Sequence, residues 1–192
     1  MTGKTKKVKN STAKVEDVAN SDSLENTKHP LEHNYSIWLY ANTSKNWETN
    51  LINLGRFNTV EDYWCFYHYM KSPSELKLGQ DYSVFKEGIQ PMWEDSANKS
   101  GGRWLIGGLK NHNVDRIWLD TVLLVIGESV IHSDIICGVV VNVRAESKVC
   151  IWTRNKDQRA NIEIGKMLRQ QLGLHKEIHY QAHRKNAYLY HV

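Results

Sequence analysis

The segment of residues 88–95, GIQPMWED, places an indole directly before a carboxylate in a stretch that is hard to explain as packing. Pro91 has no backbone N–H and biases the residue before it toward an extended conformation, so we expect Trp93 to be presented on a loop. There Trp93 can offer a flat π-face to a ligand ring while Glu94 accepts hydrogen bonds from N–H groups on the edge of that ring. Guanine is the base whose edge offers such a pair of donors.

A second tryptophan, Trp47, lies in the polar stretch from Asn42 to Asn50. If the ligand ring carries positive charge, Trp47 on its other face would add cation–π attraction. Either tryptophan taken alone is more often a core residue. Two indoles in polar, turn-rich segments without apolar periodicity favour a ligand site instead.

Basic residues near these tryptophans could hold phosphates attached to a stacked base. Arg144 and Lys148 flank the tip of a predicted hairpin, and Arg103 follows the glycine pair after the Trp93 segment. Charges at a hairpin tip are usually solvated, so they become phosphate ligands only beside a stacking site. Trp152, on the same hairpin, is either a core residue or a wall of the pocket, and both interpretations stay open.

Composition limits the class of protein. The 192 residues, 41% hydrophobic and 24% charged, fit one globular domain, and the net charge of +4 permits an anionic partner without predicting a strongly basic groove. Three cysteines without a CxxC spacing argue against disulfides and structural zinc, and we expect no cofactor. With no apolar run of about eighteen residues, we expect no membrane span and an intracellular protein, in the cytosol with the nucleus as the alternative.

Motifs typical of enzymes are missing from the sequence. There is no GxSxG, GxGxxG, P-loop or HExxH pattern. The run His132-Ser133-Asp134 joins three catalytic residue types, but neighbours in sequence do not form a triad by adjacency. We therefore expect a binding protein rather than an enzyme.

The chain divides into a polar tail and one domain. Residues 1–28 lack the apolar surface that offsets ordering entropy, so we expect a disordered tail, followed by a domain over residues 29–192. Apolar periodicity and turn residues predict strands at 34–42, 51–57, 81–86, 103–106, 135–145, 148–154, 177–183 and 187–192, and helices at 60–70, 114–128 and 158–172. This order predicts an α+β fold, with an antiparallel sheet covered by helices on one face and free for a ligand on the other.

Six segments resemble the eukaryotic translation initiation factor 4E family, the messenger RNA cap-binding proteins. They are HPLEHNYSIWLY, RFNTVEDYWCFY, DYSVFKEGIQPMWED, GGRWLIG, DRIWLDTVLLVIGES and CGVVVNVRA, in the order of the family and near its spacing. The resemblance implies a single curved antiparallel sheet with three helices on its convex face and the cap on the concave face. It also implies that the 7-methylguanosine cap of the RNA is bound and the RNA recruited to an initiation complex.

The resemblance assigns roles to the residues described above. The 7-methylguanine ring is sandwiched between two tryptophans, which fall on Trp47 and Trp93, and the Trp93 backbone N–H meets O6. Glu94 pairs with the N1 and N2 hydrogens, and Trp152 contacts the methylated base. The phosphate-binding positions fall on Arg103, which acts through water, and on Arg144 and Lys148.

Family members also bind helical peptides of initiation factor 4G and of inhibitory 4E-binding proteins on the convex face, and the resemblance implies a monomer outside that complex. These positions fall on His29, Pro30, Val60, Trp64, Leu119, Asp120, Leu123 and Ile126. The family commonly has glutamate where this chain has Asp120, and the segment after His183 is shorter, so regulation by phosphorylation there is not expected. Two alternatives follow: a cap-binding repressor with weak 4G binding, and a partner-binding module with reduced cap affinity.

Overall fold

A curved antiparallel sheet of eight strands forms the centre of the computed structural model, which describes residues 1–2, 28–110, 112–184 and 188–192, without the side chains of Trp47, Glu48 and His112. The strand order is β2-β1-β3-β5-β6-β4-β7-β8. The strands are β1 Pro30–Tyr40, β2 Leu51–Thr59, β3 Asp81–Lys86, β4 Gly102–Leu109, β5 Ile136–Asn142, β6 Ser147–Thr153, β7 His179–Ala182 and β8 Tyr188–His191.

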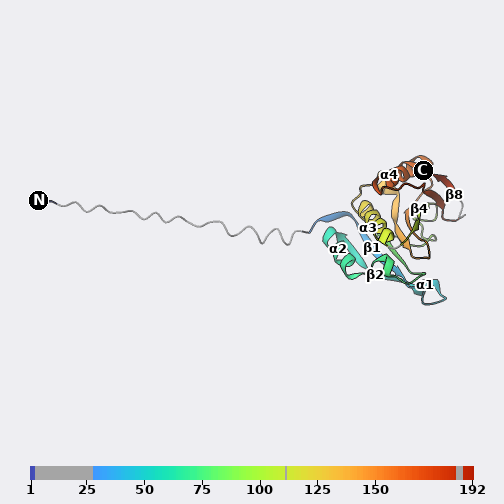
Figure 1. Cartoon of the computed structure of the whole chain (residues 1–192), viewed down its shortest axis with the longest axis horizontal. Helices are drawn as coiled ribbons and strands as arrows, with labels where there is room; N and C mark the ends of the chain where they lie inside the picture. Colours follow the sequence, from blue (N-terminus) through green and yellow to red (C-terminus); the bar gives the residue numbers. More distant parts are fainter. Residues whose placement is uncertain (3–27, 111, 185–187) are drawn as a thin grey trace.

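Three long helices cover one side of this sheet: α2 Val60–Tyr69, α3 His112–Ile126 and α4 Gln158–Gln171 (Figure 1). Helix α2 begins where the sequence predicts, because the Thr59 side chain accepts a hydrogen bond from the backbone N–H of Asp62 at 3.2 Å. Pro73 ends the helical run by starting a separate 3-10 turn, Pro73–Glu75. A second 3-10 turn spans Ser133–Ile135, and α1 is a single turn over Trp47–Asn50.

Alternation along the strands divides the buried residues between the two faces of the sheet. On β6, Val149 and Ile151 join the main core with the helices, whereas Cys150 and Trp152 join a smaller apolar cluster on the opposite face. Val122 of α3 and Ile164 of α4 belong to the same main core, so these helices lie over the first of these faces. Within the described residues, none of the three long helices packs against the cluster on the other face.

The connection between β3 and β4 crosses this second face. In the sheet β3 and β4 are separated by β5 and β6, so residues 87–101 must pass over those two strands. Ile89 and Ala97 of this connection pack against the smaller apolar cluster. The connection re-enters the sheet through Gly101, where a Cβ atom would lie 1.7 Å from the Thr153 carbonyl oxygen, so only glycine fits.

The structure confirms the predicted fold class and corrects some boundaries. β1 begins at Pro30, four residues before the predicted strand, because Pro30 pairs with Thr59 of β2. The face expected to be open is crossed by residues 87–101, and the Trp47 loop contains the helical turn α1. The predicted tail of residues 1–28 lies outside the described residues except at its two ends.

Two further features concern the described residues alone. None of their helices is both long enough and apolar enough to cross a bilayer. Within the same part of the chain, no three His, Cys, Asp or Glu side chains gather as they would around a metal ion.

Candidate functional site

A cavity of about 380 Å³ lies under the Trp93 loop on the face without long helices. Its floor is formed by β3, β5 and β6, and the loop forms one wall. We call it the ring cavity; it brings together Trp93, Glu94, Arg144 and Trp152 of the predicted site with Tyr40, Leu51, Asp81, Ser83, Pro91, Met92, Val140 and Asn142.

The Trp93 loop is fixed by the side chains of Asn98 and Asp95. Asn98 is fully buried, and its Nδ2 donates to the carbonyl oxygens of Gln90 at 2.9 Å and Met92 at 2.8 Å. The Asp95 carboxylate accepts a hydrogen bond from the Gln90 backbone N–H at 3.0 Å. These bonds satisfy loop backbone that no strand pairs, and they hold the chain on both sides of Trp93.

The loop leaves the Trp93 ring and the Glu94 carboxylate accessible. The Trp93 side chain is 47% exposed. Among the described residues, neither the Glu94 carboxylate nor the Trp93 backbone N–H has a hydrogen-bond partner. The loop therefore presents a π-face, an N–H donor and an anionic acceptor side by side, as the sequence predicts.

Trp152 is both a core residue and a wall of the ring cavity, so both interpretations left open by the sequence apply. It is 7% exposed, lies edge-on to Phe85 at 5.5 Å between ring centroids, and packs on the His183 ring at 4.1 Å. Burial lowers the pKa of His183 to about 4, and the positive charge of Arg103 lowers it further in the same direction. The His183 ring beside Trp152 is therefore neutral at physiological pH.

Arg144 reaches the ring cavity already paired with a carboxylate. Its Nη1 donates to Asp81 Oδ1 at 2.7 Å and to the Val143 carbonyl oxygen at 2.8 Å, and its Nη2 donates to Asp81 Oδ2 at 3.3 Å. A guanidinium group has five N–H donors, so two remain for an anion. Asp81 was not among the predicted site residues, because nothing in the local sequence links positions 81 and 144.

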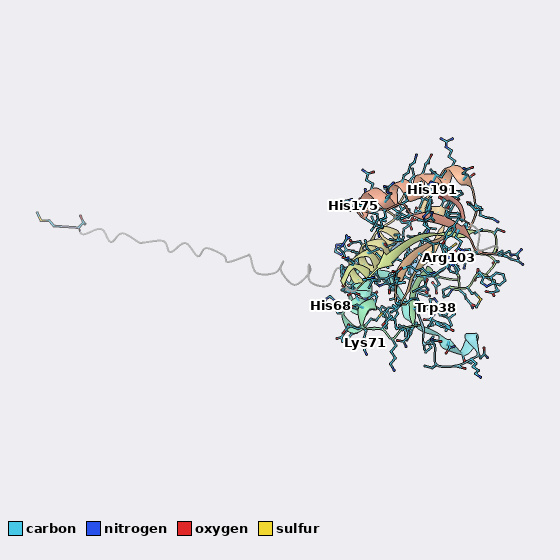
Figure 2. All side chains as sticks on the ribbon, turned by 45° about the vertical axis from the view of Figure 1, so that its right-hand side comes forward. Trp38, His68, Lys71, Arg103, His175 and His191 are labelled. Atoms are coloured by element: carbon cyan, nitrogen blue, oxygen red, sulfur yellow. The ribbon has the colours of Figure 1, made fainter. Side chains whose placement is uncertain are left out.

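The other two predicted phosphate ligands lie in a neighbouring cavity of about 480 Å³, which we call the basic cleft. Arg103 and Lys148 line it, and Arg103 pairs across the sheet with Trp152 of the ring cavity. Gln181 Oε1 accepts hydrogen bonds from Arg103 Nε at 3.1 Å and Nη2 at 2.9 Å. Figure 2 shows Arg103 between Trp38 on β1 and His191 on β8, as the strand order requires.

Trp47 lies in α1, and its side chain is outside the described atoms. Its surroundings are ordered by Asn50, which is fully buried. Asn50 Oδ1 accepts from the backbone N–H groups of Thr43 and Ser44 at 2.8 and 2.9 Å. Because Tyr40 and Leu51 both line the ring cavity, the stretch between them is anchored at two points on its rim.

Comparison with known proteins agrees with this geometry. Residues 30–189 match the family model described as eukaryotic initiation factor 4E. The chain belongs to this family. It is 47% identical over 164 residues to eukaryotic translation initiation factor 4E1 of Drosophila melanogaster, a match covering 82% of this chain and 63% of that protein. It is 44% identical over 181 residues to eukaryotic translation initiation factor 4E of Homo sapiens, covering 90% and 82% of the two chains.

Solved structures of other initiation factor 4E proteins share the fold. The complex of C. elegans eIF4E-3 with the 4E-binding protein Mextli and cap analog has a TM-score of 0.83 and 37% identity, covering 86% of this chain and 100% of that one. Ascaris suum eIF4E-3 with m7G cap has a TM-score of 0.81 and 36% identity, covering 86% and 98%. These likenesses confirm the resemblance found in the sequence.

The predicted partner surface of this initiation factor 4E family member begins where β1 meets α2. His29 and Pro30 are exposed, and the Glu61 carboxylate accepts the His29 backbone N–H at 2.8 Å and lies 2.6 Å from its ring Nδ1. The His29 carbonyl oxygen accepts the Val60 backbone N–H at 2.9 Å. These bonds hold the first residues of the domain, at the start of β1, against the first turn of α2.

The remaining predicted partner residues lie on α2 and α3. Trp64 is half-buried, as are Leu119, Asp120 and Leu123. Asp120 is paired with Arg116 at 3.2 Å. Ile126 is only 3% exposed and belongs to the main core, so it supports this surface from beneath and does not offer its side chain to a partner.

Proposed function

We propose that the protein binds the 7-methylguanosine cap of messenger RNA in the ring cavity and brings the RNA to translation initiation. The observation that carries this proposal is the pairing of a half-exposed Trp93 ring with a Glu94 carboxylate that has no partner among the described residues. The solved relatives in complex with m7G cap or cap analog support it.

Each group at the loop has a role in holding the base. The Trp93 ring stacks on one face of 7-methylguanine, and Trp47 on the rim stacks on the other, where the positive charge of the base adds cation–π attraction. Glu94 accepts hydrogen bonds from the N1 and N2 hydrogens, and the Trp93 backbone N–H donates to O6. Trp152 closes the cavity on the side of the methyl group. A base without the methyl group lacks the positive charge and binds more weakly.

The phosphates leave the ring cavity toward the basic residues. Arg144 lines the ring cavity and keeps two N–H donors for a phosphate, and Arg103 and Lys148 continue the positive charge into the basic cleft. Because Asp81 fixes the guanidinium of Arg144, little side-chain entropy is lost when the phosphate binds.

The partner surface links the bound RNA to other proteins of translation initiation. We infer that helical peptides of initiation factor 4G and of 4E-binding proteins dock across α2 and α3 near Trp64, in the helix-in-groove mode. Relatives in complex with Mextli and with 4E-BP support this assignment. The protein acts as a binding factor in the cytoplasm, with no reaction of its own and as a monomer outside its complexes.

Retention on a 7-methylguanosine triphosphate resin tests the proposal. We expect the protein to be retained, and to be released by free 7-methylguanosine triphosphate but not by GTP. A peptide from initiation factor 4G should then be captured by the resin-bound protein. Cap retention without peptide capture would indicate a repressor, and peptide capture in solution without cap retention would indicate a partner-binding module.

A further inference from the structure

The Trp93 loop borders a second cavity, of about 740 Å³, which we call the loop cavity. Residues 91–94 of the loop line the ring cavity, whereas residues 88, 89, 96 and 97 line the loop cavity. The two cavities lie at opposite ends of β1 and β3, so the same loop separates them. The residues of the loop cavity that matter below are Asn34, Lys86, Glu87, Ser96, Ala97 and Arg154.

Arg154 carries the charge of the loop cavity that is left uncompensated. Glu87 Oε1 accepts a hydrogen bond from Arg56 Nη1 at 2.6 Å, and Lys86 Nζ lies 3.4 Å from the Glu128 carboxylate. In the part of the chain that the structure describes, no carboxylate pairs with the Arg154 guanidinium. The cavity therefore has one cation that is available to an anion.

Arg154 is held close to Ser96. Its backbone N–H donates to the Ile135 carbonyl oxygen at 2.9 Å, and its side chain forms a hydrogen bond with the buried Cys137 thiol. The same thiol lies 3.8 Å from the carbonyl oxygen of Ala97, the residue that follows Ser96. Because both contact one sulfur atom, the guanidinium and the Ser96–Ala97 backbone lie at the same end of the cavity.

The Ser96 hydroxyl is free to be modified. Ser96 is exposed, and its Oγ has no hydrogen-bond partner within the described ranges. The carboxylate before it is already used, since Asp95 Oδ1 accepts the Ala97 backbone N–H at 2.9 Å and Oδ2 accepts the Gln90 backbone N–H at 3.0 Å. Asp95 is thus turned into the loop and leaves Arg154 to a group on Ser96.

We propose that Ser96 is a phosphorylation site whose phosphate pairs with Arg154 and fixes the Trp93 loop. A serine kinase transfers the γ-phosphoryl group of ATP: the bond from Ser96 Oγ to phosphorus forms, the bond from that phosphorus to the bridging oxygen breaks, ADP leaves, and the hydroxyl proton is released to solvent. The phosphate carries about −1.5 to −2 charge at pH 7, and its oxygens match the fork of a guanidinium. This inference rests on the proposed cap-binding function only for its effect on the ligand.

The pairing is tested on protein with phosphoserine incorporated at position 96 during translation. In a ³¹P NMR titration, its phosphate should bind the second proton on the order of tenfold more weakly than the same phosphate in Arg154→Gln, because the cation favours the dianion. Lys156→Gln removes an exposed cation two residues further on, outside the loop cavity, and should leave the titration unchanged. Equal titrations in the wild-type background and in Arg154→Gln would overturn the pairing.

The effect on the loop is measured by amide hydrogen exchange and by ligand affinity. Phosphoserine at position 96 should slow exchange over residues 88–98 by about two- to fivefold, the range of an exposed ion pair. The nucleoside 7-methylguanosine should bind more tightly by a similar factor, because the loop is ordered in advance. Phosphoserine in place of the exposed Ser100 is the control, since it adds the same charge to the same connection outside the loop cavity. An equal gain from phosphoserine at position 100, or a gain that survives Arg154→Gln, would overturn the fixing of the loop.

A tryptic peptide reports directly whether Ser96 is modified. Cleavage after Lys86 and Lys99 releases residues 87–99, EGIQPMWEDSANK, in which Ser96 is the only Ser, Thr or Tyr. Mass spectrometry of the protein from its own cells, in growth and under starvation, should find this peptide phosphorylated. Absence of the phosphorylated peptide in both conditions would overturn Ser96 as a modification site.

Failure of the proposed function would look different. If unmodified wild-type protein does not bind 7-methylguanosine triphosphate, the cap proposal is overturned. The phosphate titration, the exchange of the loop and the tryptic peptide would still decide for or against phosphorylation of Ser96, because none of them needs the cap.

Discussion

Asp81 holds the guanidinium of Arg144 by two parallel hydrogen bonds, 2.7 Å from Nη1 to Oδ1 and 3.3 Å from Nη2 to Oδ2. The Asp81 side chain is 15% exposed and the Arg144 side chain 44%, so the carboxylate lies beneath the cation at the wall of the ring cavity. The carboxylate positions the guanidinium and leaves two of its N–H groups for a phosphate. Without Arg144, the same carboxylate would face the phosphates unpaired.

Arg144→Ala should therefore weaken binding of 7-methylguanosine triphosphate by roughly tenfold or more, the scale of a lost hydrogen bond to a charged group. Adding Asp81→Asn to that variant should restore part of the affinity, because a repelling charge is removed. Calorimetric titration measures both effects, with the nucleoside 7-methylguanosine as the control ligand that lacks phosphates. Further weakening in the double variant would contradict a repelling role for Asp81.

Asn98→Ala should weaken cap binding although the Asn98 side chain does not line the ring cavity. Its amide holds the carbonyl oxygens of Gln90 and Met92, and leaving such buried groups unpaired costs about 1–3 kcal/mol of stability. We expect faster amide hydrogen exchange across the Trp93 loop together with the loss of affinity. Lys99→Ala, an exposed neighbour on the same loop, is the control. Normal affinity and exchange in Asn98→Ala would show that the loop does not depend on this amide.

Much of the fold follows from local sequence. Thr59 with Glu61 and Asp62 marks the start of α2, and Pro91 marks the Trp93 segment as a loop, because caps and proline act within a few residues. The Asp81–Arg144 pair joins residues 63 positions apart, so it depends on the strand order and not on a local pattern. No local pattern singles out Asn50 or Asn98, although an Asx side chain near a turn is a known way to satisfy loop backbone.

The apolar periodicity of α3 does not predict how deeply each apolar side chain is buried. It identifies apolar positions, but it does not say which of them lie at the surface. Leu123 is half-buried, whereas Ile126, three residues later, is 3% exposed. The depth of a side chain is set by the sheet beneath the helix, and it was the resemblance to the family that assigned both residues to one partner surface.

The neutral His183 ring should make stability depend on pH. Its pKa is lowered from 6.5 to about 4 in the folded protein, chiefly by burial, so the unfolded chain binds a proton from about pH 6.5 downward and the folded protein does not. The contribution of His183 to stability is fully present above its pKa in the unfolded chain. It is lost as the pH falls toward 4, by about 1–2 kcal/mol between pH 7 and pH 5. Urea unfolding at both pH values measures the loss. His183→Gln should lose less than the wild type over this interval, and an equal loss would exclude His183 as its source.

Trp64→Ala should abolish tight binding of a helical peptide from initiation factor 4G or a 4E-binding protein while cap affinity stays unchanged. Trp64 packs edge-on to Tyr67 at 5.3 Å on α2, and a buried aromatic anchor at an interface contributes about 2 kcal/mol or more, roughly 30-fold in affinity. Tyr69→Ala is the control on the same helix, since Tyr69 is 92% exposed and outside the predicted surface. Fluorescence anisotropy with a labelled peptide measures the peptide affinity of Trp64→Ala and of Tyr69→Ala. Wild-type peptide binding by Trp64→Ala would place the partner elsewhere.

The most direct test of the account is the calorimetric affinity of Trp93→Ala for 7-methylguanosine triphosphate, measured beside GTP. Loss of one stacking face should cost about 1–3 kcal/mol, roughly five- to 150-fold, and should bring the methylated ligand close to GTP. Ile131→Ala serves as the control, because Ile131 is 46% exposed against 47% for Trp93 but lies outside the ring cavity. If Trp93→Ala binds the methylated ligand as tightly as the wild type, the stacking site is not at Trp93 and the ring cavity is not the cap site.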